Sequence, residues 1–107
     1  MNAKEQHILS LIRERIRKKN PKAQVMLFGS RARGNATSNS DWDILILLNS
    51  PKITRDKEKE YREELFEVEL ETGEPISTFV FSKNEWESKH SVTPLYQNIK
   101  TDGILLT

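Results

Sequence analysis

The stretch that decides the fold reads Phe28-Gly29-Ser30-Arg31-Ala32-Arg33-Gly34 and, after a polar loop, Ser40-Asp41-Trp42-Asp43-Ile44-Leu45-Ile46. An apolar run leads into the first segment, and another apolar run leaves the second. Short runs of aliphatic residues bounded by glycine and polar residues are typical of buried strands. The sequence therefore predicts strands over 24–28 and 42–48, with a small-residue turn after one and two carboxylates at the start of the other.

The flanking sequence predicts helices around these strands, and the turn after the first strand predicts the start of a short helix over 30–33. Apolar residues at helical spacing indicate a helix over 3–19, and a helix capped by Thr54 is ended by Gly73. Further along, the pattern predicts a strand over 76–81, a short helix through Trp86, a helix over 94–102 and a last strand over 104–106. Tyr61, Phe66 and Trp86 are expected in the core. The fold class is α/β (α+β), a small mixed β-sheet flanked by helices, in one domain over 1–107.

Composition excludes several classes of protein. The chain of 107 residues has 17 Lys and Arg against 16 Asp and Glu, a net charge of +1, so its charge neither excludes nor favours nucleic acid as a partner. It has no cysteine, which excludes a disulfide framework and a thiol nucleophile. The polar first residues argue against a secretory signal, and no apolar run reaches the ~20 residues that span a bilayer. We expect a cytoplasmic protein.

The pair Asp41 and Asp43 is a candidate metal site. Side chains two residues apart on a strand point to the same face, so these carboxylates should lie side by side. Such a pair repels unless a cation lies between its members. Mg²⁺ suits this arrangement, because it is commonly bound by one or two carboxylates together with substrate phosphates. An Asp-x-Asp alone is more often a solvated loop, so the hypothesis depends on the neighbouring turn.

The turn from Gly29 to Arg33 is a candidate phosphate site. Gly29 allows a close approach of the backbone, and the Ser30 hydroxyl can donate to a phosphate oxygen. Arg31 and Arg33 can neutralise charge on a leaving pyrophosphate. The spacing of Gly29 and Gly34 matches a P-loop, but Asn35 stands where a P-loop has its lysine.

The two motifs together resemble the signature of the minimal nucleotidyltransferases, of the DNA polymerase β-like nucleotidyltransferase superfamily. The resemblance implies transfer of a nucleoside monophosphate, AMP from ATP, to a hydroxyl with release of pyrophosphate. It implies that Gly29 and Ser30 hold the triphosphate and that Asp41 and Asp43 bind Mg²⁺, two ions if the site is complete. Many such proteins act as antitoxins of a helical HEPN-type partner, some by modifying a tyrosine on it. This implies a protein acceptor here and leaves the oligomeric state open.

The chain departs from this signature at one position. The family usually supplies a third carboxylate from the next strand, where this chain has Ser77 and Thr78. That acid commonly acts as general base toward the attacking hydroxyl. Of the nearby acids Glu69, Glu71 and Glu74, only Glu74 is a candidate substitute.

The sequence leaves alternative functions open. One is a catalytically impaired nucleotide-binding module that neutralises its partner by binding alone. Another is an RNA- or antibiotic-modifying transferase, although the chain offers no further domain for such substrates.

Overall fold

The computed structural model describes all 107 residues. Helix α1 (Ala3–Lys19) begins at a capping box, in which Asn2 and Glu5 bind each other's backbone N–H. Helix α3 (Arg55–Thr72) is capped by the Thr54 hydroxyl and ends at Gly73 in the left-handed conformation. The other elements are β1 (Gln24–Phe28), α2 (Ser30–Arg33), β2 (Trp42–Leu48), β3 (Ile76–Ser82), α4 (Lys83–Ser88), α5 (Pro94–Asp102) and β4 (Ile104–Leu105).

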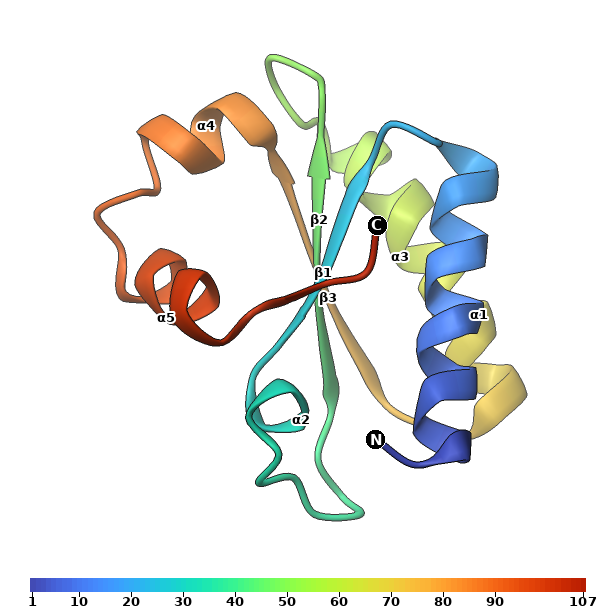
Figure 1. Cartoon of the computed structure of the whole chain (residues 1–107). Helices are drawn as coiled ribbons and strands as arrows, with labels where there is room; N and C mark the ends of the chain where they lie inside the picture. The colour runs from blue at the N-terminus through green and yellow to red at the C-terminus, as the bar shows by residue number, and fades with distance from the viewer.

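The strands form one mixed sheet in the order β3-β2-β1-β4. Figure 1 views this sheet nearly edge-on, with α1 and α3 on one side and α4 and α5 on the other. β1 is antiparallel to β2 and to β4, whereas β3 is parallel to β2. The long helix α3 provides the crossover that a parallel pair requires. β2 therefore has a neighbour on each side, as its uninterrupted apolar sequence predicts.

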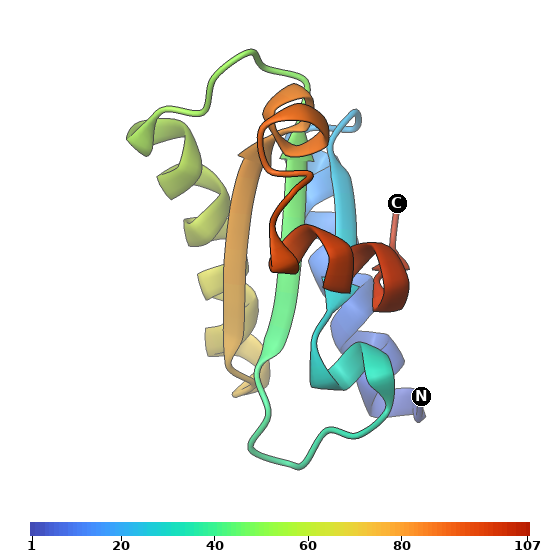
Figure 2. The same cartoon turned by 90° about the vertical axis from the view of Figure 1, so that its left-hand side faces the viewer.

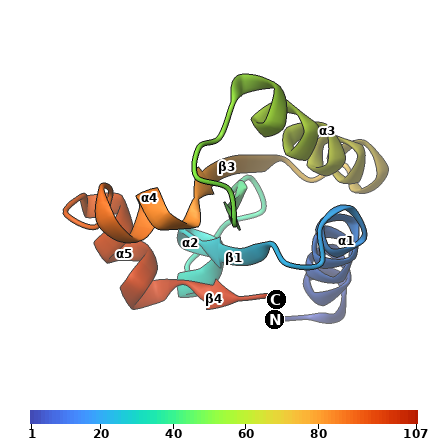
Figure 3. The ribbon, with the colours of Figure 1, turned by 90° about the horizontal axis from the view of Figure 1, so that it is seen from above.

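Helices cover both faces of the sheet (Figure 3). α1 and α3 lie on one face, over the larger core cluster, which includes Ile12, Trp42, Ile46 and Leu65. α4 and α5 lie on the other, over a smaller cluster of Phe28, Leu45, Leu47, Trp86 and Ile99. Alternation along β2 divides its side chains between the two clusters.

The order and type of the elements confirm the sequence prediction, and the bounds differ by at most two residues. The core prediction is wrong for one residue: Tyr61 and Trp86 are buried as expected, but Phe66 is 53% exposed. No helix is long and apolar enough to cross a membrane.

Candidate active site

The Gly29 turn and the Asp43 carboxylate lie against each other. In the antiparallel register, Phe28 is the partner of Asp43, so the end of β1 meets the start of β2. Gly29 has φ 78° and ψ −160°, a conformation that is essentially restricted to glycine. A Cβ atom at this position would lie 2.2 Å from Asp43 Oδ2. The backbone of the turn therefore lies closer to the carboxylate than any other residue type allows.

Asp41 and Asp43 form an electrostatically strained pair. Burial raises the pKa of the Asp43 carboxyl, and the negative charge of Asp41 raises it further, whereas Arg33 lowers it. A positive ion between the two carboxylates would relieve this repulsion, so the residues fit a divalent cation. No third His, Cys, Asp or Glu joins them in a cluster that could hold a metal. Substrate phosphates would have to supply the remaining ligands.

Arg31 and Arg33 point to different sides of the short helix α2. Positions two residues apart are separated by about 200° around a helix. Arg33 is exposed and lies close enough to Asp43 to lower its pKa. The Arg31 side chain is only 8% exposed; its guanidinium donates to the Ser40 carbonyl oxygen at 2.9 Å and stacks on Trp42, 4.5 Å from the ring centroid. The expected contact of Arg31 with a nucleotide does not fit this placement.

The position expected to carry a third carboxylate is occupied by Ser77. In the parallel register Ser77 is the partner of Asp43, and its hydroxyl donates to Asp41 Oδ2 at 2.9 Å. Thr78 faces the other side of the sheet and is buried. Ser77 therefore completes the row of side chains, but as a hydrogen-bond donor rather than an acid.

These residues lie at one end of the sheet, on the face that carries α4 and α5. In Figure 2 the two helices cross the upper and middle parts of the strands, and no helix crosses the starts of β2 and β3. α2 lies beside them. Because α2 is a single turn of four residues, the candidate phosphate contacts are the Gly29 turn and Ser30 rather than a long helix dipole.

A profile of the nucleotidyltransferase domain matches residues 9–105, which include the turn, the paired aspartates and Ser77. The chain belongs to this family. A search of curated protein sequences finds no match.

Three solved structures share the fold of this nucleotidyltransferase domain. A toxin-antitoxin structure with AMP-PNP superposes with a TM-score of 0.65 at 22% identity, over 92% of this chain and 72% of the other. A doubly substituted MntA-HpeT toxin-antitoxin superposes with a TM-score of 0.66 at 21% identity, over 92% of this chain and 72% of the other. A third, an MntA-HpeT with a tyrosine replaced by alanine, gives 0.59 at 23% identity, over 100% of this chain and 72% of the other. At these identities the likeness extends to the fold.

The substitute acid suggested by the sequence of this nucleotidyltransferase domain lies elsewhere. Glu74 forms ion pairs with Lys4 at 3.4 Å and with Arg31 at 3.8 Å, on the face covered by α1 and α3. Glu69 accepts a hydrogen bond from the Ile76 backbone N–H. Neither carboxylate lies beside Asp41 and Asp43.

Sequence reasoning missed two partners of the site residues. It identified position 77 but not the hydrogen bond from Ser77 to Asp41, because that bond depends on the register of β2 and β3. It also missed the stacking of Arg31 on Trp42. The two-residue spacing of Arg31 and Arg33 in a predicted helix was a signal that only one of them faces the site.

Proposed function

We propose that this chain transfers AMP from ATP to a hydroxyl on a partner protein, as the antitoxin-like member of a toxin–antitoxin pair. The observation that carries the proposal is the contact of the Gly29 turn with Asp43, which brings the candidate phosphate-binding turn and two carboxylates together. The family membership and the toxin–antitoxin complexes with the same fold, one of them with AMP-PNP, support it.

Each residue has a defined role in the proposed reaction. Gly29 and Ser30 bind the triphosphate, and Arg33 contributes positive charge where pyrophosphate develops. Asp41 and Asp43 would hold Mg²⁺, which supplies charge neutralisation to the phosphates when bound. The acceptor oxygen bonds to the α-phosphorus, the bond from that phosphorus to the pyrophosphate oxygen breaks, and the hydroxyl proton leaves to solvent. The acceptor is proposed to be a tyrosine on a helical HEPN-type protein, in the cytoplasm.

The test is transfer of radiolabel from α-labelled ATP to the co-purified partner, with and without Mg²⁺. We expect Mg²⁺-dependent labelling by the wild-type chain and at least a hundredfold loss in Asp41→Asn and Asp43→Asn, since each removes a charge that the cation needs. Labelling that survives both changes would refute the site assignment.

A second candidate function is a nucleotide-binding module that neutralises its partner by binding alone. The observation that favours it is Ser77, which leaves the site without a carboxylate to accept the hydroxyl proton. Calorimetry measures the binding of ATP and of the partner, and the labelling assay measures transfer. The second candidate requires that both ligands bind and that no labelling occurs.

Ser77→Asp is the decisive variant, because it places an acid opposite Asp43 in the register. If catalysis is limited by the missing base, the variant should gain labelling activity by a factor of about 10². Ser77→Ala, which only removes the hydrogen bond to Asp41, is its control.

A further inference from the structure

The outer edge of β3 and the adjoining face of α3 form an exposed surface on the side of β3 opposite to β2. We propose that this surface binds an extended segment of a partner protein, which pairs with β3 as an additional strand and carries alternating basic and apolar side chains. The inference rests on the proposed function only for the existence of a partner protein.

The edge of β3 is open for pairing. β3 is the terminal strand of the sheet, and β2 is its only paired neighbour. The Pro75 carbonyl accepts from Trp42 N–H and so points toward β2. Backbone groups alternate along a strand, so those of Thr78 and Val80 point outward. Ile76 N–H also points outward, and Glu69 binds it.

β3 lacks the features by which natural edge strands avoid pairing. Its sequence, ISTFVFS, contains no charged residue and no proline, and it is among the longest strands of the sheet. Lysines, prolines, bulges or a very short length usually blunt such an edge. The opposite edge strand, β4, has only two residues. An unprotected strand edge is the structure that binds extended peptides by strand addition.

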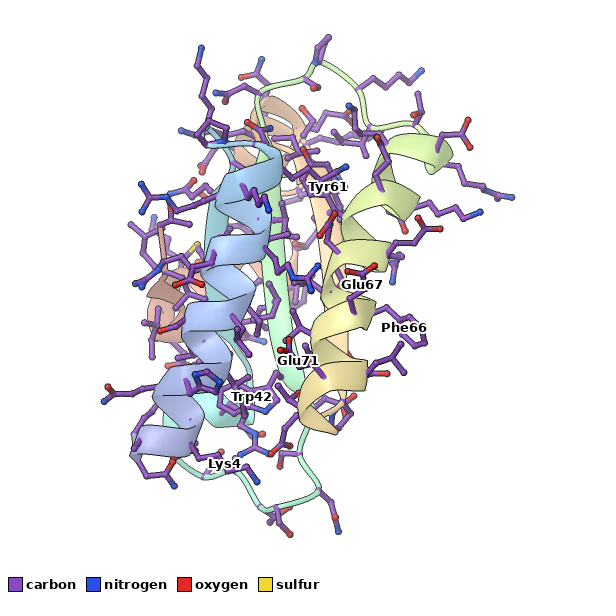
Figure 4. The ribbon with its side chains drawn as sticks, turned by 90° about the vertical axis from the view of Figure 1, so that its right-hand side faces the viewer. Lys4, Trp42, Tyr61, Phe66, Glu67 and Glu71 are labelled. Carbon is purple, nitrogen blue, oxygen red and sulfur yellow. The ribbon has the colours of Figure 1, made fainter.

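A groove with two apolar side chains, Phe66 and Ile76, lies beside this edge. It has a volume of about 420 Å³ and is lined by Arg62, Glu63, Phe66, Glu69, Ile76 and Thr78. Phe66 points outward from α3 in Figure 4, and it is 53% exposed. Leu70, one turn further, is 69% exposed. In Figure 2, α3 lies behind β3 and extends beyond it, so an added strand would rest its inner side chains on this helix.

The charge of the groove lining favours a basic partner over an acidic one. The charged side chains that line the groove are two acids, Glu63 and Glu69, and one base, Arg62, which is paired with Glu58 at 2.7 Å. The Glu69 carboxylate accepts a hydrogen bond from the Ile76 backbone N–H and keeps its negative charge beside the strand edge. The only ion-pair partner of Glu63 is the exposed Lys59, at 3.8 Å. Two copies joined through this edge would bring two acidic helices together, which argues against a second copy of the chain.

Docking here would bring the partner close to the active site. The opposite face of β3 carries Ser77, whose register partner is Asp43. Strands are spaced about 4.8 Å apart, so an added strand would lie roughly 10 Å from β2. A hydroxyl on or just beside the bound segment is then within reach of the carboxylates. The surface thus explains how a small domain holds a protein acceptor.

The test uses a short synthetic peptide of alternating valine and lysine, with a matched peptide of alternating valine and glutamate. We expect saturable binding of the lysine peptide, amide shifts at Thr78 and Val80, and slower hydrogen exchange at both. Phe66→Ser should weaken this binding about tenfold, and it should fold because Phe66 is exposed. The matched control is Leu105→Ser, at an exposed apolar side chain of β4, which should bind like the wild type.

Three outcomes would overturn the proposal: no saturable binding of the lysine peptide, equal binding of the two peptides, or equal weakening by Phe66→Ser and Leu105→Ser. A concentration-dependent dimer that excludes the peptide would assign the surface to a second copy instead. No nucleotide enters this experiment, so a failure of AMP transfer leaves its result unaffected.

Discussion

Gly29 is the residue at which any side chain would collide with the candidate site. Its φ and ψ are essentially restricted to glycine, and the missing Cβ leaves room for Asp43 Oδ2. We expect Gly29→Ala to lower the free energy of unfolding by about 3 kcal/mol and to abolish ATP binding. Urea denaturation and calorimetry measure the two effects.

Gly34 provides the control for this prediction, because it also has a positive φ, 80°, but no atom within 4 Å of an added Cβ. Gly34→Ala should cost about 1 kcal/mol of backbone strain and retain ATP binding. Equal loss of binding in both variants would mean that backbone strain, not contact with Asp43, is responsible.

Asp43 should reduce the stability of the free protein at neutral pH. Its pKa is raised above the ordinary 3.8, so ionisation is less favourable in the folded chain than in the unfolded chain. The folded state loses stability as pH rises from below 3.8 through the raised pKa. We expect Asp43→Asn to raise Tm by about 2–5 °C at pH 7 without divalent cations, and to have little effect near pH 3.

Mg²⁺ should turn the destabilising charge of Asp43 into a stabilising one. Mg²⁺ should raise the Tm of the wild-type protein in the presence of ATP, because it binds the folded state only. Asp43→Asn should lose this increase. A variant that melts below the wild type at pH 7 would contradict the assignment of Asp43 as a strained carboxylate.

At the scale of elements, Arg31 joins α2 to the elements around it. Its guanidinium binds the Ser40 carbonyl oxygen, stacks on Trp42 and lies 3.7 Å from Glu5 of α1. Arg31→Met should lower the free energy of unfolding by about 2–4 kcal/mol, because the polar groups around the guanidinium would lose their cation. Chemical denaturation measures this loss.

The matched variant Arg33→Met should behave in the opposite way. Arg33 is exposed, so its loss should change stability by no more than about 0.5 kcal/mol. It should nevertheless weaken ATP binding, since its charge acts on the site. If Arg31→Met and Arg33→Met lose stability and binding in the same proportion, the two arginines do not have separate roles.

The elements themselves were predictable because their signals are local. Caps, glycines and apolar periodicity gave the order of helices and strands. The face of a single residue was less predictable. Tyr61, Leu65 and Val68 form the buried stripe of α3, and Phe66 lies about 100° from Leu65, outside that stripe. Its aromatic character suggested burial, but its helical position determined exposure.

The two motifs of the candidate site were predictable from the sequence, but the contribution of β3 to the site was not. A shift of one residue along β3 exchanges the faces of Ser77 and Thr78, so only the register with β2 decides between them. The position of Glu74 likewise depends on α1 and α2, which provide Lys4 and Arg31. Such contacts join distant segments and leave no periodic signal in the sequence.

At the scale of the whole molecule, the two faces of the sheet should differ in stability. The cluster under α1 and α3 has 14 buried residues, whereas that under α4 and α5 has 5. Local opening is easiest where few apolar contacts must be broken. We expect amides of α5 to exchange at least about tenfold faster than those around Ile12 in α1.

Trp86→Ala should separate local opening of this layer from global unfolding. Trp86 packs between Phe81 and Tyr96, with ring centroids 5.2 and 5.3 Å away, so its loss should speed exchange throughout α4 and α5. Exchange at Ile12 should follow only the smaller change in global stability. If both regions speed up equally, the molecule opens as one unit. A selective effect would mean that the helices on the site's face can open while β1, β2 and β3 keep Gly29, Asp43 and Ser77 in place.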